Sequence, residues 1–183
     1  MSKIIIPIAT GFEEIEAISI IDICRRAGIE VIIAGVDDLA VTGANGITIV
    51  TQTSIQIVDT TDIDMIVLPG GGGGTEVLAS DETVQSLLKE FKQKDKYLGA
   101  ICAAPYALHT AGVLNHNYTC YPSFENKIRI DGFDNIKDVV IDKKVITSRG
   151  PGTAVCFALE IVKILTCEKT YLDVKNALLA KHC

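Results

Sequence analysis

Cys102 lies at the junction between a predicted strand and a predicted helix, which makes it the first candidate for chemistry. The apolar run Tyr97–Ile101 has the composition of a buried strand, and the residues from Ala103 onward favour a helix that Gly112 ends. Small residues on both sides of Cys102 indicate a nucleophile elbow, in which a strand turns sharply into a helix and presents one side chain. Pro105 suits the first turn of that helix, where its missing N–H is not needed.

The chemistry of this position depends on whether the sulfur ionises. A cysteine at a helix N-terminus faces unpaired N–H groups and the positive end of the helix dipole, and both favour the thiolate over the thiol. The alternative is an inert cysteine that packs as a small apolar side chain. The local pattern leaves both interpretations open, so the choice depends on which groups lie beside the sulfur.

Glu16 is the candidate partner for that sulfur. In a helix it shares a face with Ile20 and Ile23, so we expect its carboxyl group to be partly buried near the end of the first strand. Burial raises the pKa of a carboxyl group and keeps part of it protonated near neutral pH. The alternative is a solvated or helix-capping carboxylate, which suits Glu13 and Glu14 better.

The glycine run Gly70–Gly74 follows a predicted buried strand at Asp64–Leu68. Its backbone N–H groups could form an oxyanion hole or cradle a phosphate. The phosphate interpretation is weak because no Lys-Ser/Thr pair follows the glycines, as a P-loop requires. A plain flexible connection is the third possibility. Successive glycines cost backbone entropy, however, which favours a close approach of some group to this backbone.

No histidine is positioned to act as a base for Cys102. His109 lies seven residues further along the predicted helix, about 10 Å by helical rise. His116 falls in a turn and His182 in the C-terminal tail. A cysteine–glutamate pair is therefore favoured over a cysteine–histidine pair.

Length and composition predict one globular domain that binds neither membrane nor nucleic acid. The 183 residues include 48% hydrophobic residues, and the net charge of −6 disfavours a nucleic-acid partner. We find no apolar run long enough for a membrane span and no signal-peptide pattern, so we expect a cytoplasmic protein. The six cysteines form no C-x-x-C pair. We expect reduced thiols, with neither a zinc site nor a disulfide framework.

The order of the predicted elements indicates an α/β fold, namely a flavodoxin-like doubly wound α/β/α sandwich with a mostly parallel sheet. A small β-hairpin is predicted at Val41–Val50, around a type I′ turn at Asn45-Gly46. In such folds sites form at the carboxyl ends of the strands. The predicted strands are Ile4–Ile8, Ile29–Gly35, Asp64–Leu68, Tyr97–Ile101, Asp138–Asp142 and Lys144–Ser148. The predicted helices are Glu13–Ala27, Thr75–Lys94 with a break near Ser80, Ala103–Ala111, Thr153–Leu165 and Glu168–Lys181.

Five segments, in this order, resemble motifs of the ThiJ/PfpI superfamily, and within it the branch of the Parkinson-disease protein deglycase and its bacterial ThiJ-type relatives. The segments are Gly11–Glu16, Arg25–Gly28, Val67–Gly71, Ala100–Pro105 and Thr147–Thr153. The resemblance covers nearly the whole chain and implies a single ThiJ/PfpI-like domain over residues 1–183 that forms a homodimer. It implies that Cys102 is the reactive cysteine, that Glu16 is the carboxyl group beside it, and that Gly70 and Gly71 belong to the oxyanion-hole segment.

The resemblance also implies a cofactor-free and metal-free enzyme of the glutathione-independent glyoxalase or deglycase type, with a role in oxidative and carbonyl stress defence. Its substrates would be reactive dicarbonyls or their early glycation adducts. We expect Ala103 to supply a further oxyanion N–H, and Tyr121, Arg149 and Pro151 to line the pocket. Some relatives carry a histidine where this chain has Tyr121.

Two other functions remain open on the same residues. An exposed thiolate at Cys102 could be oxidised to a sulfinate, which would suit a redox-sensing chaperone. A cysteine peptidase or amidotransferase-like hydrolase is the other, but it needs a base that orients the thiol.

Overall fold

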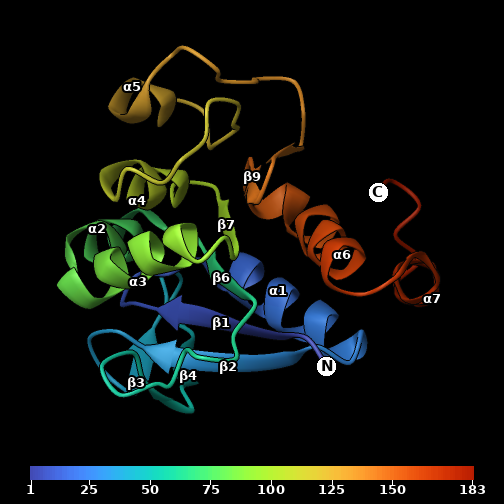
Figure 1. Ribbon diagram of the computed structural model, residues 1–183, viewed down its shortest axis with the longest axis horizontal. Coiled ribbons are helices and arrows are strands. Elements are labelled where there is room, and N and C mark those ends of the chain that lie inside the picture. The colour runs from blue at the N-terminus through green and yellow to red at the C-terminus, as the bar shows by residue number, and fades with distance from the viewer.

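The computed structural model describes residues 1–183 and places a seven-stranded sheet between two groups of helices (Figure 1). The strand order is β5-β2-β1-β6-β7-β9-β8, and all pairs are parallel except β8 with β9. The predicted doubly wound sandwich is therefore confirmed. The strands are β1 (Lys3–Ile8), β2 (Glu30–Gly35), β5 (Thr53–Ser54), β6 (Met65–Leu68), β7 (Tyr97–Ile101), β8 (Val139–Asp142) and β9 (Val145–Ser148).

The helices divide between the two faces of the sheet. One face is covered by α1 (Glu14–Arg26), α6 (Ala154–Leu165) and α7 (Glu168–Ala177), and the other by α2 (Gly72–Ser80), α3 (Glu82–Gln93) and α4 (Pro105–Thr110) (Figure 1). The short helices α5 (Glu125–Ile128) and η1 (Pro151–Thr153) lie in connections. None of these helices has the length and apolar character needed to cross a membrane.

The first strand shows why its apolar run is continuous. Ile4, Ile6 and Ile8 belong to a core of 28 buried residues on one face of the sheet, and Ile5 belongs to a core of 20 on the other. Side chains alternate between the faces of a strand, so a strand covered on both faces needs apolar residues at every position.

Two helices begin where a carboxylate side chain caps them. The Glu13 carboxylate accepts from the N–H of Glu16 at 2.8 Å, so α1 begins at Glu14. Asp81 accepts from the N–H of Val84 at 2.8 Å, which confirms the predicted break between α2 and α3.

Three helix boundaries differ from the sequence prediction by more than one residue. The glycines Gly72–Gly74 form the first turn of α2 instead of a loop, and α4 begins at Pro105 instead of Ala103. The last helix ends at Ala177, shortly before Leu179 adopts a left-handed conformation with φ +55°.

The hairpin is present, but its turn is longer than predicted. β3 (Ala40–Thr42) pairs antiparallel with β4 (Thr48–Val50), and five residues connect them instead of two. The buried Glu14 carboxylate accounts for this loop. It accepts from the backbone N–H of Asn45 at 2.7 Å and from the side-chain amide of Asn45 at 2.8 Å.

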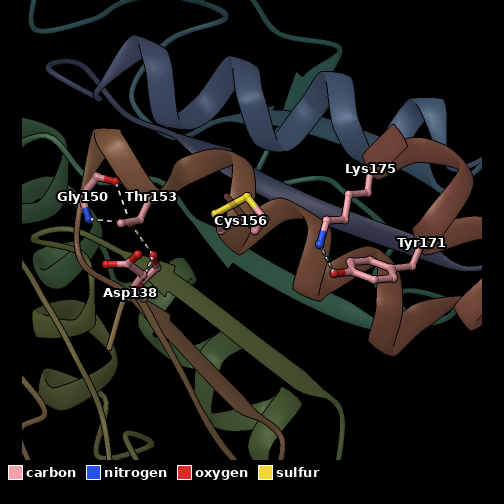
Figure 2. The surroundings of a disulfide bond; sticks show 8 residues. Asp138, Gly150, Thr153, Cys156, Tyr171 and Lys175 are labelled. Atoms are coloured by element: carbon pink, nitrogen blue, oxygen red, sulfur yellow. Dashed lines mark hydrogen bonds between the residues drawn. A yellow bond between two sulfur atoms is a disulfide. The ribbon is translucent and has the colours of Figure 1, made fainter. Parts of the chain in front are cut away.

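Two cysteines form a disulfide, so the expectation of six reduced thiols is wrong for this pair. Cys156 in α6 is bonded to Cys183, which follows α7 (Figure 2). The two residues are 27 positions apart, and no short motif joins them in the sequence. The other four cysteines are free.

Candidate active site

Cys102 occupies a sharp turn between β7 and α4. Its φ of +65° is uncommon for a residue with a side chain and marks a strained backbone. Two hydrogen bonds hold it there: its N–H donates to the Ser148 carbonyl at 2.9 Å, and its own carbonyl accepts from the Tyr121 N–H at 2.9 Å. This is the elbow geometry that the sequence predicts. The residue is 8% exposed, so the opening to the sulfur is narrow.

Glu16 lies in the first turn of α1 and is fully buried. Its Oε2 accepts from the Gly70 N–H at 2.7 Å, whereas Oε1 has no hydrogen-bond partner. Burial raises the pKa of this carboxyl group from 4.5 to about 7, although the hydrogen bond from Gly70 and the nearby Cys102 thiol act in the opposite direction. The carboxyl group therefore exchanges its proton near neutral pH.

Gly70 separates the carboxyl group from the cysteine. A Cβ atom placed on Gly70 would lie 2.6 Å from the Cβ of Cys102 and 2.6 Å from Oε2 of Glu16. The two side chains are thus neighbours across a position that only glycine can occupy without displacing them. The structure therefore places together the carboxyl group and the sulfur that the sequence pairs.

The protonation of the sulfur differs from the expectation based on the helix dipole. Burial, and after it a negative charge on Glu16, raises the pKa of the Cys102 thiol to about 12, whereas the N–H groups of Gly71 and Ala103 act in the opposite direction. The dipole contributes less than expected because α4 begins only at Pro105 and the sulfur is buried. Above pH 7 the pair then holds one proton, mainly on the sulfur, and one negative charge, mainly on the carboxylate.

Two backbone N–H groups point to the same sulfur. Those of Gly71 and Ala103 approach Cys102, and neither donates to a backbone carbonyl. Gly71 adopts φ +92°, and a Cβ there would lie 2.3 Å from the Gly11 carbonyl oxygen. A close backbone contact therefore requires this glycine, as the sequence argument expects. Unpaired donors beside a nucleophile are the arrangement that stabilises an oxyanion.

The three predicted pocket residues line one cavity. Tyr121, Arg149 and Pro151 surround an open space of about 270 Å³. The hydrogen bond from Tyr121 to the Cys102 carbonyl places this wall beside the elbow, although Cys102 itself does not line the cavity. A larger cavity of about 360 Å³ contains none of the predicted site residues.

The histidines lie apart from the sulfur. His116 pairs with Asp131 at 3.8 Å, and His182 lies beside the disulfide. Sequence reasoning does not single out Ser148, whose carbonyl holds the Cys102 N–H. No residue-type signal could identify it, because any residue supplies a carbonyl.

The raised pKa of Glu16 predicts a pH-dependent stability. A carboxyl group whose pKa rises from 4.5 to about 7 on folding stabilises the protein fully at low pH and loses this contribution as pH rises through 7. Between pH 4.5 and 8 we expect the free energy of unfolding of the native protein to fall by up to about 3 kcal/mol relative to Glu16→Gln. Urea unfolding of both proteins at several pH values measures this; a constant difference would contradict it.

Comparisons with known proteins, by family model, by sequence and by structure, all match most of this chain to the same group of proteins. A model of the DJ-1/PfpI family matches residues 2–164. Glutathione-independent glyoxalase DJR-1.2 of Caenorhabditis elegans is 39% identical over 92% of this chain and 91% of its own length. The crystal structure of Drosophila melanogaster DJ-1beta superposes with a TM-score of 0.94 at 37% identity, covering 98% of both chains. Protein DJ-1 homolog B of Arabidopsis thaliana is 37% identical over 98% of this chain, which spans only 40% of that relative.

Proposed function

Because the chain belongs to the DJ-1/PfpI family, we propose that it is a glutathione-independent glyoxalase or deglycase that uses Cys102 as its nucleophile. Its substrates are reactive dicarbonyls or their early glycation adducts. The observation that carries this proposal is the buried Glu16 carboxyl group, which titrates near neutral pH beside the sulfur. A general acid and base works best when its pKa lies near the working pH.

In the first step the Cys102 sulfur attacks the aldehyde carbon of the dicarbonyl. The carbon–sulfur bond forms, Glu16 takes the thiol proton, and the electron pair of the carbonyl moves to its oxygen. The N–H groups of Gly71 and Ala103 hold that oxyanion. Glu16 then returns the proton to the oxygen, which gives a hemithioacetal.

In the second step Glu16 moves a proton between adjacent carbons. It removes the proton from the carbon that carries sulfur while the neighbouring carbonyl oxygen gains a proton, which gives an enediol. It then delivers a proton to the neighbouring carbon as the hydroxyl group on the sulfur-bearing carbon loses its proton, which leaves a hydroxyacyl thioester. Water then cleaves the thioester, releases the hydroxy acid and restores the Cys102 thiol. The overall reaction adds one water to the dicarbonyl, so it needs no oxidant or reductant.

The product distinguishes this reaction from simple trapping of the aldehyde. We expect purified protein without glutathione to convert methylglyoxal to lactate and glyoxal to glycolate over many turnovers. Enzymatic measurement of the hydroxy acid checks this. Loss of dicarbonyl without hydroxy acid, or at most one equivalent consumed per chain, would contradict the proposal.

Gly70→Ala tests whether the two groups must meet across this glycine. The added methyl group would lie 2.6 Å from both Cys102 Cβ and Glu16 Oε2, so it must push them apart. We expect kcat/KM to fall on the order of 10²-fold, since small displacements of reacting groups cost that much. Gly72→Ala is the matched control because nothing lies within 4 Å of its added methyl group. Equal losses in both variants would contradict the arrangement.

Oxidation sensing is a second candidate function, and the unpartnered Oε1 of Glu16 favours it. A protonated carboxyl group beside Cys102 could donate a hydrogen bond to a sulfinate and stabilise it. We expect mild peroxide to add two oxygen atoms selectively at Cys102, as peptide mass spectrometry would show. Oxidation spread evenly over Cys102 and the exposed Cys167 would contradict this role.

We also propose a homodimer. Ile15 and Ile18 of α1 are exposed large apolar side chains, as is Ile47 in the hairpin loop. Glu14 accepts from the Ile47 N–H at 3.3 Å, which holds that loop near the start of α1 and supports one continuous apolar surface. Sedimentation equilibrium should report twice the chain mass of 19.6 kDa.

A further inference from the structure

A second cluster of reactive side chains lies on the face of the sheet covered by α6 and α7. Cys156 belongs to the first turn of α6, and His182 and Cys183 follow α7. Their possible ligand atoms all lie within 4.8 Å of one another. Figure 2 shows the sulfur bridge of Cys156 close to the turn that carries Gly150 and Thr153. The cluster uses neither Cys102 nor Glu16, so it is independent of the proposed function.

The same residues line a cavity of about 200 Å³ that also contains two carboxylates. Asp138 and Glu160 contribute to its wall, and neither carboxylate makes a hydrogen bond or an ion pair within the chain. His182 is exposed and both cysteines are partly exposed, so small molecules and ions can reach the cluster from solvent. Two sulfurs, one imidazole and a carboxylate are the ligands that Zn²⁺ takes in tetrahedral protein sites.

We propose that Cys156, Cys183 and His182 form a binding site for a thiophilic divalent cation such as Zn²⁺, and that this site opens when the disulfide is reduced. In the oxidised state the two sulfurs are bonded to each other and cannot act as thiolate ligands. The disulfide therefore prevents the cation from binding. Asp138, Glu160 or a water completes the fourth position.

The redox step balances with a thiol reductant. Two reductant thiols supply two electrons and two protons, become a disulfide, and leave Cys156 and Cys183 as thiols. Binding of Zn²⁺ then displaces two protons from these thiols, and His182 donates a nitrogen lone pair. An oxidant that removes two electrons from the thiolate pair reforms the disulfide and releases the cation.

The backbone allows the small movement that this exchange needs. Zn–S bonds of about 2.3 Å in a tetrahedral site hold two sulfurs roughly 3.8 Å apart, so the sulfurs must separate after reduction. Cys156 is fixed in α6, whereas Cys183 lies after the left-handed turn at Leu179, outside any helix. The segment after α7 can therefore adjust while α6 stays in place.

Short-range sequence patterns do not indicate this site. The two cysteines are 27 residues apart and come from different elements, whereas sequence rules for zinc rely on closely spaced pairs. The expectation of no zinc site followed from that rule, and only the packing of α7 against α6 brings the ligands together.

Titration with Co²⁺ and then Zn²⁺ tests the proposal, in a Cys102→Ser protein so that the other candidate thiol cannot bind. After reduction by a phosphine and its removal without oxygen, we expect one Co²⁺ per chain, with thiolate charge-transfer and tetrahedral visible bands that Zn²⁺ abolishes. The oxidised protein should show neither band. In the oxidised protein, a non-reducing peptide map should contain the Cys156–Cys183 pair.

Three variants in the same background separate ligand loss from other effects. Affinity for Co²⁺ should fall at least tenfold in Cys156→Ser and in His182→Ala. His182→Ala keeps both cysteines and changes an exposed side chain, so a loss of Co²⁺ binding in this variant reports the lost ligand and not a misfolded protein. Cys167→Ser removes an exposed free cysteine outside the cluster and should bind as the parent does. Equal binding by oxidised and reduced protein, no thiolate band after reduction, or an equal loss in Cys167→Ser would overturn the proposal.

Discussion

Replacing Cys102 with serine is expected to lower hydroxy-acid formation from methylglyoxal by at least about 10³-fold. A serine hydroxyl is a far weaker nucleophile, and a carboxylate that titrates near 7 cannot ionise it to a useful extent. The substitution changes one atom and keeps the two backbone hydrogen bonds of the elbow. The initial rate of lactate formation by the purified variant measures the effect.

Cys167→Ser is the matched control for that variant. Cys167 is exposed and precedes α7, away from the elbow, so its replacement should leave the rate unchanged. Thermal unfolding of both variants would show whether either has lost its fold. A Cys102→Ser protein that keeps more than a tenth of the native rate would rule out the sulfur as nucleophile.

Replacing Glu16 with glutamine is expected to lower kcat/KM by about 10²- to 10³-fold and to remove its rise with pH. In the native protein the carboxylate form takes the thiol proton, so kcat/KM should increase with pH through about 7. Glutamine retains an oxygen that can accept from the Gly70 N–H, but it cannot accept the thiol proton. The pH profile of kcat/KM for both proteins between pH 5 and 9 measures this.

Glu14→Gln is the control for Glu16→Gln. It removes another buried carboxylate of α1 but leaves the proposed base in place. Glu14 holds the hairpin loop through Asn45 and does not contact the sulfur. We expect this variant to be less stable but to keep the rise of kcat/KM near pH 7. If the rise disappeared in Glu14→Gln and persisted in Glu16→Gln, the assignment of the base would be wrong.

The layers, the buried position of Glu16 and the sharp turn at Cys102 could be predicted because each depends on a local pattern. A strand covered on both faces must be apolar throughout, as at Ile4–Ile8, and a helix that packs on the sheet repeats its apolar residues, which places Glu16 on the buried face. Small residues around Cys102 indicated the turn that its φ of +65° now shows.

The features that could not be predicted depend on contacts between distant segments. The Glu14 carboxylate binds a loop 31 residues away and thereby sets the length of the hairpin turn. Cys156 meets Cys183 only because α7 packs on α6. The pKa of the Cys102 thiol is raised mainly because the folded chain buries the sulfur. The helix dipole, considered alone, predicted a lowered pKa, which is the wrong direction of shift.

One measurement examines most directly whether Cys102 and Glu16 share a proton. The rate at which iodoacetamide alkylates Cys102 should rise with pH through about 7 in the native protein, because the Glu16 carboxylate that forms there can take the thiol proton as the sulfur attacks. In Glu16→Gln the same rise should move to much higher pH, since burial alone then governs the thiol. Superimposable pH profiles for the two proteins would contradict the shared proton and the mechanism built on it.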